Sequence, residues 1–152
     1  MQSKFSVGSL VVYEDAIHEV IEVLQQDIAV AYKLLTLAFL SDENRTVVLM
    51  YQTASYQGRD ISQPFIVAEV KLTACSSSKP KFAFNEWVKF GDGVRVLPGV
   101  VRFIKYENNN YWYDLIDADP PERFDENLRN GYSVHGYGHM QGGLADERFI
   151  SK

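Results

Sequence analysis

Cysteine is almost absent from this chain of 152 residues, because Cys75 is the only one. A single thiol cannot close a disulfide within the chain, which excludes a small domain stapled by disulfide bonds and favours a reducing, cytoplasmic location. Histidine is scarce as well, with three residues. Of these, His135 and His139 lie four positions apart, but two glycines stand between them and no cysteine or third histidine is near. The sequence therefore predicts no metal and no cofactor.

Long apolar runs are also missing. The longest mostly apolar stretch, residues 34–40, is far too short to span a bilayer, so no membrane-spanning segment is expected. Catalytic fingerprints are missing too. The chain has no nucleophile-elbow or phosphate-loop pattern, and the Gly-Asp-Gly of residues 91–93 lacks the third glycine and the following helix of a dinucleotide site. These absences predict a protein that is not an enzyme.

Positive charge is in deficit, with 15 Lys and Arg against 20 Asp and Glu and a formal net charge of −5. Proteins that bind duplexes without regard to sequence neutralise phosphates with Lys and Arg, so this balance argues against that class. Apolar residues are plentiful at 46% of the chain, and charged residues make up 23%. That composition is typical of a folded globular protein rather than a disordered one.

The two halves of the chain align without a gap when they are shifted by 83 positions (91 − 8 = 83). Apolar positions in residues 17–30 then fall on apolar positions in residues 100–113, and the Asp-Glu-Asn of residues 42–44 recurs at residues 125–127. Self-similarity at a fixed spacing indicates a repeated structural unit. Units of about 70 residues are close to the smallest that can bury a core alone, so we expect them to pack on each other.

Residues 16–40 admit two interpretations. Their Val and Ile content favours two strands, at residues 17–24 and 28–37, but apolar residues also recur at the spacing of one long amphipathic helix. The corresponding segment of the second copy has three consecutive asparagines, residues 108–110, between two apolar runs. Asparagines suit a hairpin turn and oppose a helix interior. We therefore favour a hairpin in both copies, and the helix stays open as the alternative.

The remaining patterns predict a mainly β chain in two modules. The first module covers residues 1–75, a Ser-Ser-Ser-Lys-Pro linker covers residues 76–80, and the second module covers residues 81–152. Further strands are expected at residues 7–13, 46–52 and 65–73, and a turn at Pro98–Gly99. The second module is expected to contain a short helix near residues 120–129, opened by a capping Asp119 and two prolines, and a Gly-rich C-terminal segment.

Each copy opens with a glycine, an apolar strand, a turn and a long hairpin. In this respect the chain resembles SH3-like small β-barrels in tandem, and the residues that carry the resemblance are Val7-Gly8-Ser9-Leu10-Val11-Val12 and Phe90-Gly91-Asp92-Gly93-Val94-Arg95-Val96. The resemblance implies a five-stranded barrel in each module, and folds of this kind mostly serve as binding modules. It singles out no specific family and transfers no functional residue, because a fold alone does not determine a function.

Aromatic and basic residues are dense between residues 81 and 113. Aromatic rings beside cations suit single-stranded nucleic acid, and Trp and Arg also anchor protein interfaces. A role in the core is the alternative, because about half of the residues on a barrel strand face inward. If the segment forms a binding surface, we expect it to use Trp87, Arg102, Lys105, Tyr111 and Trp112.

Three functions stay open, and we favour the first. It is a non-catalytic protein-binding or adaptor protein, which suits the net charge better than the second, a single-stranded nucleic-acid-binding protein that uses the same surface. The third is a small enzyme with a cleft between the modules, where His18, His135 or His139 would converge. Edge strands of small barrels can pair between chains, so a homo-oligomer is also open.

Overall fold

The computed structural model describes residues 2–43, 55–56, 59–91, 96–117 and 144–152. The chain is mainly β, as predicted, with a mixed sheet of ten strands and a separate ribbon of two short strands, β4 (Ser55–Tyr56) and β5 (Arg59–Asp60). The helical segments in these ranges are two 3-10 turns, η1 (Glu69–Lys71) and η3 (Glu147–Phe149). Neither turn, nor any other part of these ranges, forms a helix that could cross a membrane.

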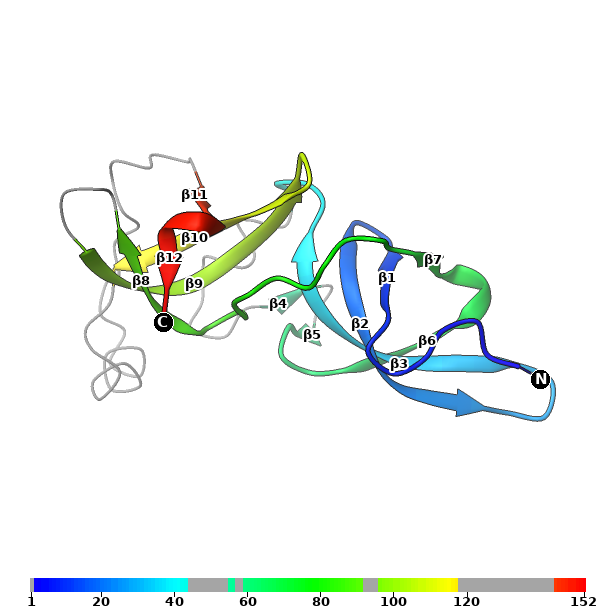
Figure 1. The fold of residues 1–152 in the computed structure, drawn as a ribbon. Helices are drawn as coiled ribbons and strands as arrows, with labels where there is room; N and C mark the ends of the chain where they lie inside the picture. The colour runs from blue at the N-terminus through cyan, green and yellow to red at the C-terminus, as the bar shows by residue number, and fades with distance from the viewer. Residues whose placement is uncertain (1, 44–54, 57–58, 92–95, 118–143) are drawn as a thin grey trace.

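Five strands of the first half pair in the order β7-β1-β2-β3-β6 (Figure 1). They are β1 (Leu10–Tyr13), β2 (Ala16–Gln25), β3 (Val30–Phe39), β6 (Phe65–Ala68) and β7 (Thr73–Ala74). β2 and β3 form an antiparallel hairpin that closes at Gln25 and Val30, so the helix over residues 16–40 is excluded. On β3 the side chains of Val30, Tyr32 and Leu34 are buried while those between them are partly exposed, which is the alternation of a strand with one face on the core.

Five strands of the second half pair in the order β12-β8-β9-β10-β11. They are β8 (Trp87–Gly91), β9 (Val96–Glu107), β10 (Asn110–Asp117), β11 (Ala145–Asp146) and β12 (Ile150–Ser151). The predicted asparagine turn is confirmed, because Asn108 and Asn109 join β9 to β10 with φ values of 54° and 60°. This left-handed backbone is one that asparagine tolerates better than most residues.

Two sequence predictions meet a different outcome, and two others fall outside the described residues. The turn predicted at Pro98–Gly99 is wrong, because β9 runs straight through it. Proline is tolerated there, since pairing with β10 begins only at Gly99 and no described strand needs its N–H on that side. The strand predicted at residues 65–73 is interrupted by η1, which turns the chain from β3 to β1. The strand predicted at residues 46–52 and the helix predicted near residues 120–129 lie entirely outside the described residues.

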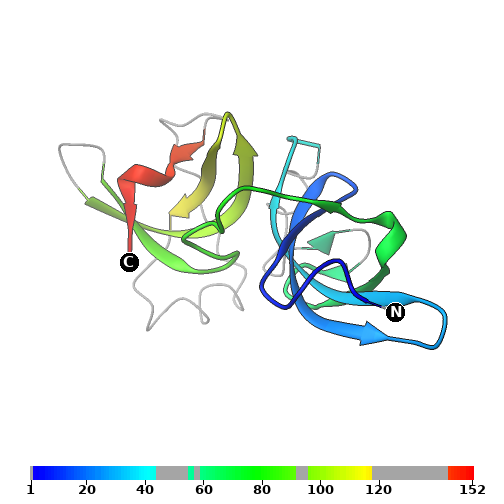
Figure 2. The same ribbon diagram turned by 45° about the vertical axis from the view of Figure 1, so that its right-hand side comes forward.

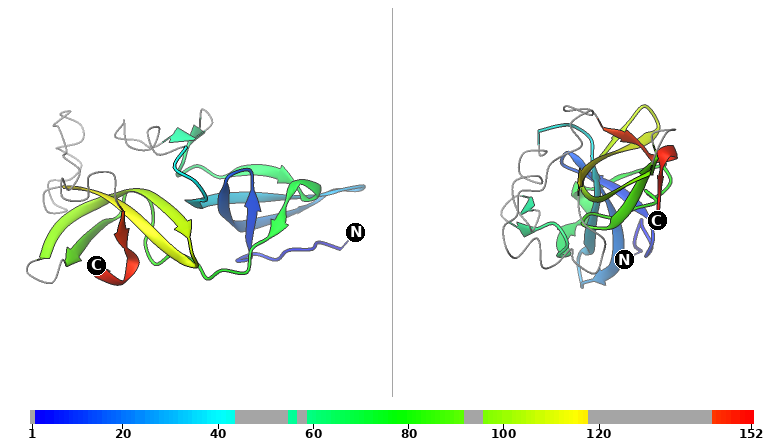
Figure 3. Two further views of the ribbon diagram at one scale, coloured as in Figure 1. Left: turned by 90° about the horizontal axis from the view of Figure 1, so that it is seen from above. Right: turned by 90° about the vertical axis from the view of Figure 1, so that its left-hand side faces the viewer.

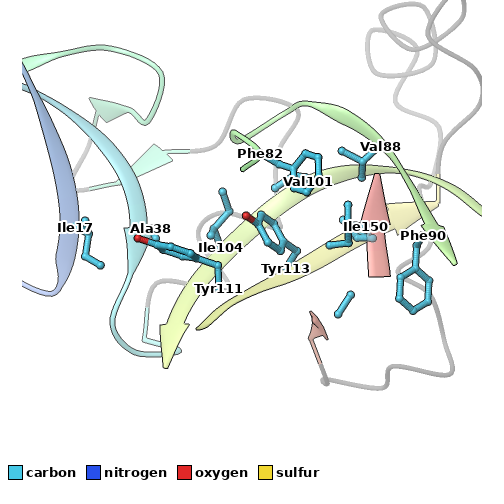
Figure 4. Packing of buried hydrophobic residues seen from close by; sticks show 12 residues of the cluster. Ile17, Ala38, Phe82, Val88, Phe90, Val101, Ile104, Tyr111, Tyr113 and Ile150 are labelled. Carbon is cyan, nitrogen blue, oxygen red and sulfur yellow. The ribbon is translucent and has the colours of Figure 1, made fainter. Parts of the chain in front are cut away.

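Buried apolar residues from both halves pack together. In one cluster Ile17 and Ala38 of the first half lie with the core of the second half, and Figure 4 shows Tyr111 of β10 reaching toward Ala38. In a second cluster Phe39 of β3 stacks on Phe103 of β9, with ring centroids 5.5 Å apart and 5° between the ring planes. A parallel bridge joins β3 to β9 nearby. The halves therefore share buried surface, while a third cluster lies entirely in the first half.

The segment predicted as a linker is held by both halves. Figures 2 and 3 show it crossing from β7 to β8 between two groups of strands. Lys79 forms an ion pair of 2.9 Å with Glu19 of β2, and the hydroxyl of Tyr111 donates a hydrogen bond of 2.7 Å to the carbonyl oxygen of Ser78. Pro80 is buried. These contacts fix the path of the segment on both sides, unlike a flexible tether.

A set of contacts in the first half has a counterpart in the second. The carboxylate of Glu69, at the start of η1, accepts hydrogen bonds from the backbone N–H of Lys4 and the hydroxyl of Tyr32. In the second half a glutamate at the start of η3 does the same. Glu147 accepts from the backbone N–H of Lys81 and the hydroxyl of Tyr113.

The counterparts extend to the rings and to the chain entering β1 and β8. Phe5 packs edge-on to Tyr32 at 5.5 Å, and Phe82 packs edge-on to Tyr113 at 5.6 Å. The chain enters each half through a residue of positive φ, at 95° for a glycine and 68° for an asparagine. The backbone N–H groups of these residues, Gly8 and Asn85, donate to carbonyls of β2 and β9 at 2.8 and 2.7 Å.

The spacing of these counterparts is not constant. The separation is 77 positions between Lys4 and Lys81 (81 − 4), and 81 between Tyr32 and Tyr113 (113 − 32). The difference of four arises in the first hairpin of each half, because two residues separate the paired Tyr13 and Ala16 whereas six separate their counterparts, the paired Phe90 and Leu97. The gap-free shift of 83 is therefore not the spacing that relates these contacts.

Candidate functional site

Two of the five predicted binding residues lie side by side. Lys105 of β9 and Trp112 of β10 are direct cross-strand partners, and Trp112 has Asp146 of β11 as its partner on the other side. Directly opposed residues of neighbouring strands point to the same face of a sheet. The side chains of Lys105, Trp112 and Asp146 therefore form a row across three strands, which we call the Trp112 row.

Two other predicted residues are buried. Tyr111 is 3% exposed and Arg102 is 4% exposed, so neither presents a side chain to a partner in this structure. Successive residues of a strand point to opposite faces, so Tyr111 faces the core while its neighbour Trp112 faces the other way. Burial raises the pKa of the Tyr111 hydroxyl to about 12. Arg102 donates a hydrogen bond of 3.1 Å to the side-chain oxygen of Asn85, and burial lowers the pKa of its guanidinium.

The fifth predicted residue is separate from the row. Trp87 of β8 is half-buried and opposes Val100 of β9, five positions before Lys105 on that strand. The structure therefore brings together Lys105 and Trp112 but not Trp87. The sequence did not point to Asp146 as their neighbour, because β11 has only two residues, too few for any alternation to be read from the sequence.

Charges at both ends of the Trp112 row are already matched. The ammonium of Lys105 lies 3.1 Å from a carboxylate oxygen of Asp42 and 3.5 Å from one of Glu107, and the hydrogen bond with Asp42 raises its pKa. At the other end, Arg148 pairs with Asp146 at 2.8 Å. The hydrogen bonds from Arg148 lower the pKa of the Asp146 carboxyl to about 2.

Trp112 is the half-buried centre of the row. Its indole N–H donates a hydrogen bond of 3.1 Å to the carbonyl oxygen of Glu107, so the polar atom of the ring is satisfied within the chain. A partner that covered this ring would gain apolar contact without stranding a polar group. The matched charges on either side also mean that the row offers little free positive charge to a phosphate backbone.

The described residues show no cluster that would bind a metal ion. Among them there is no group of three or more His, Cys, Asp or Glu that could hold a metal ion, and His135 and His139 lie outside the described ranges. His18 is fully buried. Its Nε2 lies 3.1 Å from the carbonyl oxygen of Tyr13 and its Nδ1 lies 3.0 Å from the hydroxyl of Thr36, so the ring is held in the interior.

The chain was compared with protein-family models, with curated proteins and with solved structures, and none of the three comparisons gives a match. The fold and the Trp112 row therefore have to be interpreted from their own geometry.

The lowered pKa of Asp146 predicts a loss of stability in acid. Because its folded pKa of about 2 lies below the ordinary value of 3.8, its ionised form stabilises the fold above about pH 4, and this contribution is lost as the pH falls toward 2. We expect Asp146→Asn to melt at a lower temperature than the wild type at pH 7 and to lose less on going from pH 4 to pH 2. Thermal melts at both pH values measure this, and parallel curves for the two proteins would contradict it.

Proposed function

We propose that the chain is a tandem of two SH3-like modules, residues 1–75 and 81–152, joined by residues 76–80. The support is the pairing order, in which five described strands of each half follow the same sequence of neighbours. A 3-10 turn precedes the last strand in each half, and its glutamate accepts from a tyrosine hydroxyl and a backbone N–H. Two copies of one small unit account for this agreement more simply than two unrelated ones.

We propose further that the protein is a non-catalytic binding or adaptor protein whose partner is another protein. The observation that carries this proposal is the Trp112 row, a half-buried tryptophan with a satisfied N–H between two matched ion pairs. Energetically dominant positions in protein interfaces are enriched in tryptophan and arginine, and a rim of polar groups that excludes water surrounds them. Arg148, whose side chain is 77% exposed, would belong to that rim.

Substitution of Trp112 by alanine tests the proposal. We expect proteins captured from a lysate of the native host by the immobilised wild-type chain to be retained at least about tenfold less by Trp112→Ala, because truncation of a central aromatic commonly costs about 2 kcal/mol of binding. The melting temperature should hardly change. Quantitative mass spectrometry of the retained proteins and a thermal melt measure the two effects.

A control for this test is Ile28→Ala, which removes an exposed apolar side chain, 85% accessible, between β2 and β3 and outside the row. It should retain the wild-type set of proteins. Equal capture by Trp112→Ala and the wild type, or unfolding of Trp112→Ala, would show that the residue is not a binding position.

Single-stranded nucleic acid is the alternative partner for the same surface, and it has less support. Of the predicted cations, Arg102 is buried and Lys105 is paired with two carboxylates. Titration of a fluorescent oligonucleotide at low and moderate salt separates the two partners. A protein-binding surface should give little binding at either salt concentration, whereas nucleic-acid recognition should give affinity that falls steeply with salt.

A further inference from the structure

The Trp112 row has an excess of negative charge at one end. The ammonium of Lys105 pairs with the carboxylates of Asp42 and Glu107 at 3.1 and 3.5 Å, and within the described residues these two carboxylates share that one ammonium. At the other end of the row one carboxylate pairs with one guanidinium. Both cations of the row are therefore matched, while one negative charge is left over beside Lys105 (two carboxylates against one ammonium).

This excess charge lies at the surface. The side chains of Asp42 and Glu107 are 57% and 55% exposed, whereas the Lys105 side chain that joins them is 13% exposed. A partner that approaches from solvent therefore meets the two carboxylates before the ammonium. Water screens such exposed charges, so they add little to the stability of the fold, but they still discriminate between partners of opposite charge.

The carboxylate of Glu107 is a close neighbour of the indole ring. Glu107 is two positions after Lys105 on β9 and pairs with Asn110, two positions before Trp112 on β10, so all four side chains share one face of the sheet. Diagonal neighbours on such a face lie within reach of aromatic and long side chains. The indole N–H also donates to the backbone carbonyl of Glu107, which holds the ring toward that end of β9. A ligand that covers the ring therefore lies beside the excess charge.

The second carboxylate comes from the other half of the chain. Asp42 follows β3 of the first half, and the parallel bridge between Phe39 and Lys105 brings the end of β3 to β9. Figure 1 shows the end of β3 next to the hairpin of β9 and β10. The surface formed by the Trp112 row and these two carboxylates therefore needs both halves of the chain.

We propose that this surface binds a basic segment of another protein, an inference that rests on the proposed binding function. An apolar side chain of the segment covers the ring of Trp112, and a lysine or arginine next to it lies against the carboxylates of Asp42 and Glu107. Charge complementarity selects this partner. The net charge of −5 attracts basic segments and repels acidic ones at a distance, and the excess carboxylate does the same at contact.

Selection of random peptides displayed on phage tests the proposal with the full chain as the immobilised protein. Peptides that the wild type retains and Trp112→Ala does not are the ligands of the row. We expect them to be enriched in lysine and arginine and to carry a large apolar residue. A neutral or acidic set, or the absence of any set that depends on Trp112, overturns the inference. Capture of host proteins by the wild type and not by Trp112→Ala would still support the broader proposal, so the two fail separately.

The double variant Asp42→Asn/Glu107→Gln isolates the role of charge. It turns one excess negative charge into one excess positive charge at nearly constant side-chain size. For a synthetic copy of the most enriched peptide, we expect the dissociation constant to rise by about three- to tenfold at low salt, and the difference from the wild type to shrink as salt is added. Fluorescence anisotropy of the labelled peptide measures both, and a thermal melt shows whether the variant is folded.

A matched control is Glu22→Gln/Asp27→Asn, which changes the net charge of the chain by the same amount. Glu22 also pairs with a lysine, Lys33 at 3.8 Å, and its side chain is 54% exposed. Asp27 is exposed in the loop between β2 and β3, at the opposite end of these strands from Asp42. The control should bind the peptide within about twofold of the wild type. Equal binding by the wild type and Asp42→Asn/Glu107→Gln, or an equal loss in the control, would overturn the role assigned to these two carboxylates.

Discussion

Replacement of Phe103 by alanine is expected to lower the free energy of unfolding by about 3 to 5 kcal/mol, the largest effect of any single substitution considered. Phe103 of β9 is fully buried and stacks on Phe39 of β3, with Ala16 and Ile61 in the same cluster. Truncation removes apolar contact and leaves a cavity between the halves. For a chain of this length the expected fall in melting temperature is about 10 °C or more.

A double-mutant cycle identifies the origin of that loss. If the stacked rings stabilise the fold beyond the area that they bury, the double variant Phe39→Ala/Phe103→Ala should lose less unfolding free energy than the sum of the two single variants. The expected difference is about 0.5 to 1.5 kcal/mol. Phe149→Ala, at an exposed phenylalanine, should stay within about 0.5 kcal/mol of the wild type. A Phe103→Ala variant as stable as this control would show that the contact between Phe39 and Phe103 does not stabilise the packing of the two halves.

Replacement of His18 by leucine is expected to cost about 2 to 4 kcal/mol, although leucine is apolar and similar in size. The ring of His18 is fully buried between Tyr13 and Thr36. Because a carbonyl only accepts, Nε2 carries the hydrogen that the Tyr13 oxygen receives, and in the neutral ring Nδ1 then accepts a hydrogen bond from the Thr36 hydroxyl. Leucine makes neither hydrogen bond, so the carbonyl of Tyr13 and the hydroxyl of Thr36 both lose their bond to residue 18. The Thr36 side chain is only 6% exposed, so water does not readily replace that bond.

Removal of that hydroxyl should rescue part of the loss. In His18→Leu/Thr36→Val the unpaired hydroxyl of residue 36 is absent, so the double variant should be more stable than His18→Leu by about 1 kcal/mol. Thr36→Val alone should destabilise the wild type, since it breaks the same hydrogen bond from the other side. Urea denaturation of the four proteins measures the cycle. Strictly additive effects would show that the two side chains are not coupled.

The hairpins were predictable because their sequence signals are local. Val and Ile over residues 17–24 and 28–37 indicated β2 and β3, and the asparagines of residues 108–110 indicated the turn after β9. The interruption of the strand at residues 65–73 was not predictable in this way. Glu69 leaves the strand to accept from Lys4 and Tyr32, which are far from it in sequence, and no local pattern reports such a partner.

The repeat illustrates a different limit. Hydrophobic matching without gaps found a resemblance between the halves, but the recurring contacts follow shifts of 77 and 81 positions, as at Lys4 with Lys81 and Tyr32 with Tyr113. In a strand, a shift by two positions returns side chains to the same face, so apolar positions still match when the shift is wrong by an even number. Such matching alone cannot fix the register.

The candidate site was predictable in composition but not in exposure. Aromatic and basic density drew attention to residues 81–113, and alternation required that part of them be buried. The alternation separates Trp112 from Tyr111, but Arg102 lies in a run of six residues of β9, 99–104, that are all buried. That run is covered on both faces, partly by packing against the first half at Phe39, which no pattern within the second half reveals.

Differential scanning calorimetry of the full chain tests most directly whether the two halves form one structure with a shared core. The account predicts one transition near neutral pH, with a calorimetric enthalpy of about 100 kcal/mol that equals the van't Hoff enthalpy. Two separate transitions, each with roughly half of that enthalpy, would contradict it, because they would show that the clusters containing Ile17, Ala38 and Phe39 do not couple the halves.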